Sequence, residues 1–289
     1  MCADSYTTSQ GFTPEVQRLA VAYKIDLAQL RRSAFGGSVL GKRTGNSVEF
    51  EDRKEYQQGD DLRRVDWRSY ARTGRMTVKL FREEIAPRVE IFIDASASMN
   101  TSETKAIRTL ETAAFFYLAA RRSHFPVRVF QLGKSMSPLA PMEGASRWFP
   151  DPTLSPLPAL QQSQHQMRGG LAIVISDLLF DDEPRAIMRH LKWADRIFLV
   201  QVLSGLERNP AAAMEVDALL RLEDAEDASA IDVRLDSATV SAYMTRINAL
   251  VDEYRHLTHA GGHAHTMVDD AQSLQDCVVE FLRAGMISQ

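Results

Sequence analysis

The sequence of 289 residues has little cysteine, with Cys2 and Cys277 as the two thiols. A structural disulfide is not expected, which favours a reducing compartment. No apolar run approaches the roughly 18 residues that a membrane-spanning helix needs. Residues 1–10 also lack the basic and apolar regions of a signal peptide. We therefore expect a cytoplasmic protein without a transmembrane segment.

A strong excess of charge of one sign is missing as well. The formal net charge is −4, so no global basic character points to nucleic acid or an anionic membrane. Hydrophobic residues make up 45% and charged residues 25%, which is the composition of a globular protein. The length allows one large domain or two smaller ones, either of which can bury a sizeable core.

The first 85 residues differ in pattern from the rest. Thr13 and Pro14, followed by apolar residues at alternating steps of four and three, predict a helix over residues 13–32. Further elements are expected as short strands at 48–50 and 77–81 and as a helical turn within 60–70. We expect an N-terminal extension over residues 1–85, packed on or beside a core formed by residues 86–289.

From residue 89 onward, apolar runs alternate with helical patterns. Strands are expected at 89–94, 127–132, 171–177, 196–203 and 263–268. Helices are expected at 103–122, 184–193, 237–258 and near the C-terminus, with a hairpin at 218–222 and 231–235. This alternation predicts parallel βαβ units in a doubly wound, mostly parallel, Rossmann-like α/β sheet. The continuous apolar character of the strands indicates a sheet buried on both faces.

Two aspartates stand at the ends of expected strands, Asp94 and Asp177. Ligands of open α/β sheets bind beyond the carboxyl ends of the strands, so these positions are candidates for a site. Ser96 and Ser98 follow Asp94 at alternate positions. Their hydroxyl oxygens are hard ligands that suit Mg²⁺, Mn²⁺ or Ca²⁺, with Mg²⁺ favoured. The alternative is a strand-end turn in which both serines only cap the next helix.

The Asp-x-Ser-x-Ser motif at residues 94–98 resembles the first element of the metal-ion-dependent adhesion site of von Willebrand factor A domains. That resemblance implies an Asp after a later strand, which Asp177 matches. It also implies a Thr on a second loop, for which Thr153 is the candidate, although the glycines that usually precede this Thr are absent. In that family the hydroxyls contact the ion directly, and an open position accepts an Asp or Glu from another protein.

A second resemblance lies upstream of the expected core. It is carried by the segments at 48–50, 53–56, 59–63, 65–67 and 71–74. Together they resemble the signature of the bacterial family filed as domain of unknown function fifty-eight, in which a von Willebrand A-like core follows. The resemblance covers roughly residues 35–285. It implies a pairing with MoxR-type AAA+ ATPases in assembly, maturation or stress functions.

These features favour a metal-dependent interaction module, an adaptor or chaperone-like partner of such an ATPase that binds a client protein through its Asp or Glu. No catalytic constellation or phosphate-binding glycine loop is found, so an enzyme is not expected. The alternative is a metal-dependent phosphate-ester hydrolase that uses the same aspartates. A phosphoaspartyl hydrolase would want a second acid at position 96, where this sequence has serine.

The segment 62–82 holds seven basic residues and one acidic residue. It could bind an anionic polymer such as nucleic acid or lipid headgroups. Internal pairing with acidic residues such as Asp60 and Asp61 is the favoured interpretation, and we expect no nucleic-acid partner.

Four histidines crowd together near the C-terminal end of the sequence: His256, His259, His263 and His265. No cysteine or carboxylate completes a known zinc-ligand spacing around them. We therefore favour histidines of a helix end and a loop over a zinc site.

Overall fold

The computed structural model describes residues 6–25, 48–58, 60, 62, 65–83, 88–139, 147–148, 155–166, 169–180, 182–213, 219–223 and 230–289. Contacts along the chain define two compact units, one of residues 1–33 and 87–289 and the other of residues 34–86. The extension expected over residues 1–85 is therefore divided between the two units.

The larger unit is built on a six-stranded sheet with the order β13-β10-β9-β5-β6-β7. Its strands are β5 (Val89–Asp94), β6 (Val127–Leu132), β7 (Met136–Pro138), β9 (Leu171–Ser176), β10 (Arg196–Leu203) and β13 (Ala264–Asp269). All neighbouring strands pair in parallel except β6 and β7, which pair antiparallel. The prediction of an α/β fold with a mostly parallel sheet is confirmed, and β7 adds an antiparallel edge.

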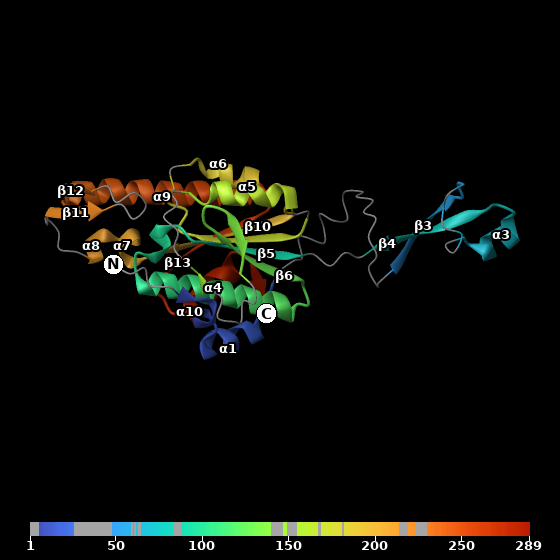
Figure 1. Cartoon of the computed structure of the whole chain (residues 1–289), viewed down its shortest axis with the longest axis horizontal. Coiled ribbons are helices and arrows are strands. Elements are labelled where there is room, and N and C mark those ends of the chain that lie inside the picture. Colours follow the sequence, from blue (N-terminus) through green and yellow to red (C-terminus); the bar gives the residue numbers. More distant parts are fainter. Residues whose placement is uncertain are drawn as a thin grey trace. The chain divides into compact units, whose positions relative to one another are not determined.

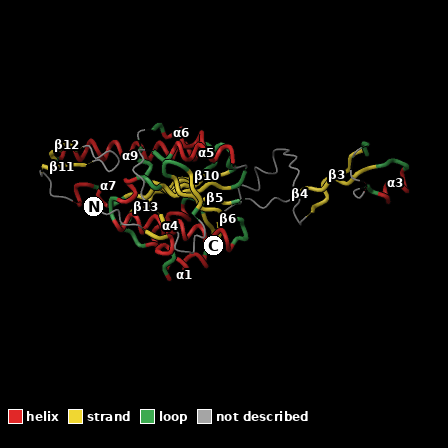
Figure 2. Tube along the Cα trace, viewed as in Figure 1, coloured by secondary structure: helices red, strands yellow, loops and turns green. Residues whose placement is uncertain are grey.

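Helices cover both faces of this sheet (Figure 1). One face carries α1 (Pro14–Ala22), α4 (Glu103–Arg122) and α10 (Leu274–Arg283), and the other carries α5 (Leu157–Gln166), α6 (Pro184–His190) and α9 (Ser237–Ala260). Figure 2 shows the strands enclosed between these helical layers. No helix of the described residues is long and apolar enough to cross a membrane.

The core has two parts because successive side chains of a strand point to opposite faces. Ile91 and Ile93 pack with Phe115, Phe116 and other residues of the α4 face. Phe92, between them, belongs to the core under α5, α6 and α9. Every residue of β5, β9 and β10 is buried, as expected for a parallel sheet covered on both sides.

The first helix begins where the sequence predicts and ends earlier. The Thr13 hydroxyl accepts a hydrogen bond from the Val16 amide (3.2 Å), which caps α1. The helix ends at Ala22, because the next residues form β2 (Lys24–Ile25), which pairs with β14 (Ile287–Ser288). Residues 26–32 of the predicted helix lie outside the described residues.

The remaining short elements of the larger unit lie around the sheet. They are β1 (Tyr6–Thr7) paired with β8 (Arg147–Trp148), η1 (Thr8–Gly11), η3 (Ala97–Asn100), α7 (Gly205–Arg208), α8 (Pro210–Ala213), and the hairpin of β11 (Leu219–Glu223) and β12 (Ala230–Arg234). The long helix α9 is capped by Asp236, which accepts from the Thr239 amide at 2.7 Å, and Ser237 is its first residue.

The smaller unit contains an antiparallel pair, β3 (Val48–Glu55) and β4 (Thr77–Glu83), and the helix α3 (Trp67–Thr73). Asp66 caps α3 by accepting from the Ser69 amide (3.0 Å), and Gly74 ends it with a φ of 68°. This left-handed conformation is the one that glycine adopts without steric cost. The helix therefore lies slightly later in the chain than the turn predicted within residues 60–70.

The strand order of the large sheet reverses beside β5. Helix α4 leads from β5 to β6 on one side, whereas β9 pairs with β5 on the other side. The carboxyl ends of β5 and β9 therefore meet at a topological switch point. In open α/β sheets this is the position where ligands bind.

Candidate functional site

Asp94 ends β5 and is fully buried. Its Oδ1 accepts a hydrogen bond from the Ser96 amide at 2.8 Å. Its Oδ2 accepts from the Ser176 hydroxyl at 2.6 Å. Since Ser176 is the last residue of β9, this second bond joins the ends of the two central strands.

The protonation of Asp94 follows from its surroundings. Burial, together with the neighbouring carboxylate of Asp177, raises the pKa of Asp94 to about 7. Both effects disfavour the charged form, and the hydrogen bonds from Ser176 and Ser96 offset them in part. A cation placed next to this carboxyl group would favour its ionised form.

The two serines of the loop lie together. Their hydroxyl oxygens are 3.0 Å apart. Ser96 is buried and Ser98 half-buried. Ser96 precedes η3 but its side chain makes no capping bond to it, and α4 is capped by Ser102, whose hydroxyl accepts from the Lys105 amide at 3.1 Å. The interpretation that the serines serve only as helix caps is therefore not supported at Ser96.

Asp177 follows β9 directly and is buried. Its Oδ1 accepts from the Leu179 amide (3.1 Å), and its own amide donates to the sulfur of Met99 at 3.2 Å. The next residue, Leu178, has a φ of 56°, a left-handed conformation that is unfavourable for a leucine. Such strain costs about 1–3 kcal/mol and concentrates at functional sites.

A third charged side chain, Lys105, is part of this cluster and was not expected from the sequence. It is fully buried on α4, and its Nζ donates to Asp177 Oδ2 (2.9 Å) and to the Ser98 carbonyl (2.9 Å). It also donates to Glu207 Oε1 at 2.7 Å. Burial lowers the pKa of Lys105, but the two carboxylates more than offset this, so its pKa lies above the ordinary value.

The sequence contains one indication that Lys105 is buried. Lys105, Thr109 and Thr112 are spaced as neighbours on one helix face, and all three are fully buried. A polar stripe next to the apolar stripe of a helix indicates that the polar face also meets protein.

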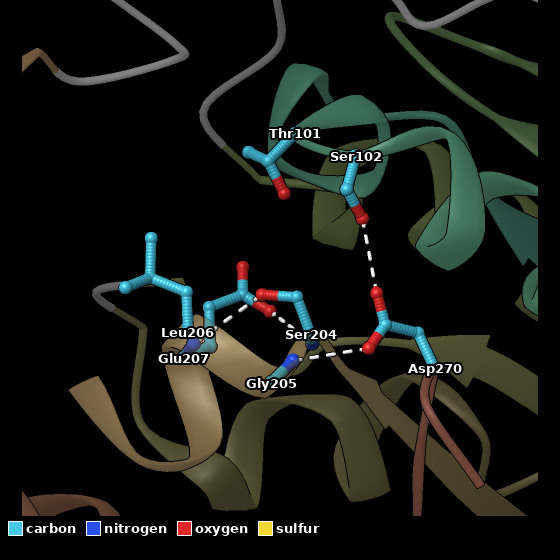
Figure 3. A pocket seen from close by; sticks show the side chains of 7 residues that line it. All are labelled: Thr101, Ser102, Ser204, Gly205, Leu206, Glu207 and Asp270. Carbon is cyan, nitrogen blue, oxygen red and sulfur yellow. Dashed lines mark hydrogen bonds between the residues drawn. The ribbon is translucent and has the colours of Figure 1, made fainter. Parts of the chain in front are cut away.

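A cavity of about 270 Å³ adjoins this cluster. It lies where β10, β13 and the start of α4 come together, and it is lined by Thr101, Ser102, Ser204, Gly205, Leu206, Glu207 and Asp270 (Figure 3). Asp270 accepts from the Ser102 hydroxyl and the Gly205 amide, each at 3.0 Å. Glu207 belongs both to the cavity wall and to the contacts of Lys105, so the two features share a side chain.

The structure thus brings together four of the five predicted metal-site residues, Asp94, Ser96, Ser98 and Asp177. The fifth, Thr153, lies outside the described residues. Carboxylate and hydroxyl oxygens are the donors that Mg²⁺ and Mn²⁺ prefer, so the donor chemistry fits such an ion. Among the described residues there is no group of three or more His, Cys, Asp or Glu placed to hold a metal ion, so the candidate site depends on its hydroxyls.

Two of the clustered histidines have packing roles. His265 is buried, stacks on the ring of Tyr254, and its Nε2 lies 3.3 Å from Gln201 Oε1. Burial lowers the pKa of His265 to about 4, which keeps it neutral at physiological pH. The Nδ1 of His263 accepts from the Ile197 amide at 3.3 Å.

The basic segment is described in part. The side chains of Arg68, Arg72 and Arg75 are exposed, and no ion pair within the described part of the chain involves them. Asp60, an expected partner, instead pairs with Lys54 at 2.6 Å. Residues 61, 63 and 64 lie outside the described residues.

Comparisons with known proteins give two findings. The family described as "Protein of unknown function DUF58" matches residues 52–148. Among solved structures, the chain is similar to an aerotolerance-related membrane protein from Bacteroides fragilis NCTC 9343, crystallised with multiple mutations to serines. That likeness has 14% identity and a TM-score of 0.29, and it covers 68% of this chain and 99% of that chain. No curated protein matches this sequence.

Proposed function

Residues 52–148 of this chain match the family described as protein of unknown function DUF58, and because that description assigns no activity, we propose a function from the chain's own site. The proposed function is that of a metal-ion-dependent protein–protein interaction module. The observation that carries it is the gathering of Asp94, Ser96, Ser98 and Asp177 at the switch point between β5 and β9.

In this proposal the large unit is a von Willebrand factor A-like core. The hydroxyls of Ser96 and Ser98 would hold the ion directly, with Thr153 as the third hydroxyl. Asp94 and Asp177 would support it. The ion would supply a positive charge with an open coordination position, which suits an Asp or Glu of another protein.

Binding is better supported than hydrolysis by the environment of Asp94. A carboxylate nucleophile needs a free, ionised oxygen, whereas both oxygens of Asp94 accept hydrogen bonds. Its raised pKa further lowers the fraction that is ionised at neutral pH. These features suit a residue that orders a loop.

The partners follow from the family resemblance. We propose a MoxR-type AAA+ ATPase as the partner, with a client protein that offers an acidic side chain to the ion. The cavity lined by Leu206 and Ser204 lies beside the site and would add contacts around that acidic residue. A cytoplasmic setting is proposed from the scarcity of cysteine.

Titration calorimetry with Mg²⁺ and Mn²⁺ tests the proposal. The wild-type chain should bind one ion with a millimolar or lower Kd, and Ser98→Ala should weaken binding because it removes a hydroxyl ligand from a half-buried position. Thr245→Ala is the control, since it removes an exposed hydroxyl of α9, which bonds the Ser241 carbonyl (2.8 Å) outside both the loop and the cavity. A pulldown with and without chelator then tests whether partner capture requires the ion. Absence of binding by the wild-type chain, or equal binding by Ser98→Ala, would contradict the proposed function.

A further inference from the structure

We infer that Lys105 is a built-in cation that competes with a divalent metal ion for the carboxylate of Asp177. The inference rests on the proposed metal-dependent function and concerns its regulation. Without a metal ion, the Lys105 ammonium pairs with the Asp177 carboxylate. A divalent ion can contact this carboxylate only when the ammonium leaves it.

The geometry of the ammonium group supports this inference. The Lys105 Nζ has three donor hydrogens and three acceptors within hydrogen-bond distance: Asp177 Oδ2 (2.9 Å), the Ser98 carbonyl (2.9 Å) and Glu207 Oε1 (2.7 Å). The side chain is fully buried, so no water replaces these contacts. These acceptors offset the free-energy cost of burying the charged ammonium group.

Both carboxylate oxygens of Asp177 accept hydrogen bonds in the metal-free chain. Its Oδ1 accepts from the Leu179 amide and its Oδ2 accepts from Lys105. The Lys105 contact with the Ser98 carbonyl also brings the ammonium to the serine loop itself. An ion that approaches Asp177 from that loop therefore meets a positive charge that already holds the carboxylate.

The charge of Lys105 opposes the entry of a second cation. Lys105 is the cation that pairs with both Asp177 and Glu207 in this buried cluster. Two positive charges at close range repel strongly in a buried site, where water screens little. The competition is therefore direct.

Glu207 can remain the ion-pair partner of the Lys105 ammonium after this ammonium has left Asp177. It is less buried than Asp177, with 17% of its side chain exposed against 3%, and it lines the cavity beside Leu206. A Lys105 that leaves Asp177 keeps its contact with Glu207. Metal entry is thereby coupled to the charge at the wall of the cavity.

Two variants test this inference. Lys105→Met removes the ammonium but keeps a long, unbranched side chain. The double variant Lys105→Met/Glu207→Gln removes one positive and one negative charge, so it lacks the internal cation at the local net charge of the wild type. The double variant leaves one carboxylate of this cluster without a cation instead of two, so it is the form to measure if Lys105→Met alone fails to fold.

The measurements are the Kd of Mg²⁺ and Mn²⁺ by calorimetry and the rise in melting temperature on adding each ion to chelator-treated chain. Both variants should bind with a Kd about tenfold or more below that of the wild type. Their melting temperatures should rise more with the ion, because ligand binding to the native state stabilises it.

The outcomes separate the two proposals. Equal Kd values in all three chains would overturn the role of Lys105 and leave the proposed function standing. Tighter binding by Lys105→Met but not by the double variant would assign the gain to net charge and overturn the competition. Binding by both variants but not by the wild type would support the competition and overturn metal-dependent function of the wild-type chain. No binding by any chain would overturn both.

Discussion

The buried carboxyl group of Asp94, with a pKa near 7, contributes to the pH dependence of the stability of the metal-free chain, and Asp94→Asn should remove that contribution. Asp94 is fully buried between the ends of β5 and β9. Asparagine keeps the acceptor for the Ser96 amide, and its amide group can donate to the Ser176 oxygen. It lacks only the ionisable group.

The sign follows from the direction of the shift. The pKa of Asp94 is raised from 3.8 to about 7 by burial and by Asp177, so the folded chain binds a proton that the unfolded chain has lost between these values. The free energy of unfolding therefore falls as pH rises from about 4 to about 7. A shift of about 3 units corresponds to roughly 4 kcal/mol over this window.

His265 contributes with the opposite sign. Burial lowers its pKa from 6.5 to about 4, so the unfolded chain binds the extra proton and the contribution to stability is lost as pH falls through that range. The shift of about 2.5 units corresponds to roughly 3 kcal/mol. The net slope of the wild type therefore does not isolate Asp94, whereas a difference between variants does.

Urea denaturation in chelator between pH 4.5 and 8 measures the free energy of unfolding of the wild type, Asp94→Asn and His265→Gln. Relative to the wild type, Asp94→Asn should gain stability as pH rises, and His265→Gln should gain stability as pH falls. The two difference curves should have opposite slopes. Parallel curves for the wild type and Asp94→Asn would refute the protonated state of Asp94.

Three further predictions concern other parts of the chain. Gly170→Ala should lower the free energy of unfolding by more than about 1 kcal/mol, since φ is +91° and an added Cβ would lie 2.4 Å from a carbonyl oxygen; Gly205→Ala, with nothing within 4 Å, is the control in the same denaturation assay. In a Cys2→Ser background, Cys277 should react with a thiol reagent only at the rate of unfolding, because burial raises its pKa to about 11. Arg68→Glu should lower the salt concentration that elutes the chain from heparin if the exposed arginines bind anions, and an unchanged elution would exclude that role.

The limits of most strands in the large sheet could be predicted closely because each of these strands is one continuous apolar run. The runs that form β5, β6 and β10 match the predicted ranges, and β9 ends at Ser176, one residue before the predicted end. A fully buried parallel strand has no polar face, so its limits coincide with the limits of the apolar run. The placement of Asp94 and Asp177 at adjacent strand ends follows from the same patterns.

The elements that depend on distant pairing could not be predicted. Helix α1 ends at Ala22 because Ile25 pairs with Ile287, a contact between the two ends of the chain. Strand β7 has only three residues and exists by pairing with β6. Neither the 3.6-residue nor the 2-residue period carries such information, since both describe a segment by itself.

The candidate site shows the same limit at the level of side chains. The Asp-x-Ser-x-Ser motif specifies which donors follow β5, but the charge that an ion meets is set by Asp177, Lys105 and Glu207, which arrive from β9, α4 and α7. Asp94 is held partly neutral and Asp177 is paired, so the resting site carries less negative charge than its sequence suggests. Metal affinity in this chain is therefore expected to depend on residues outside the motif. For that reason Lys105→Met and its charge-balanced double variant are more decisive tests of the site than replacement of the motif aspartate.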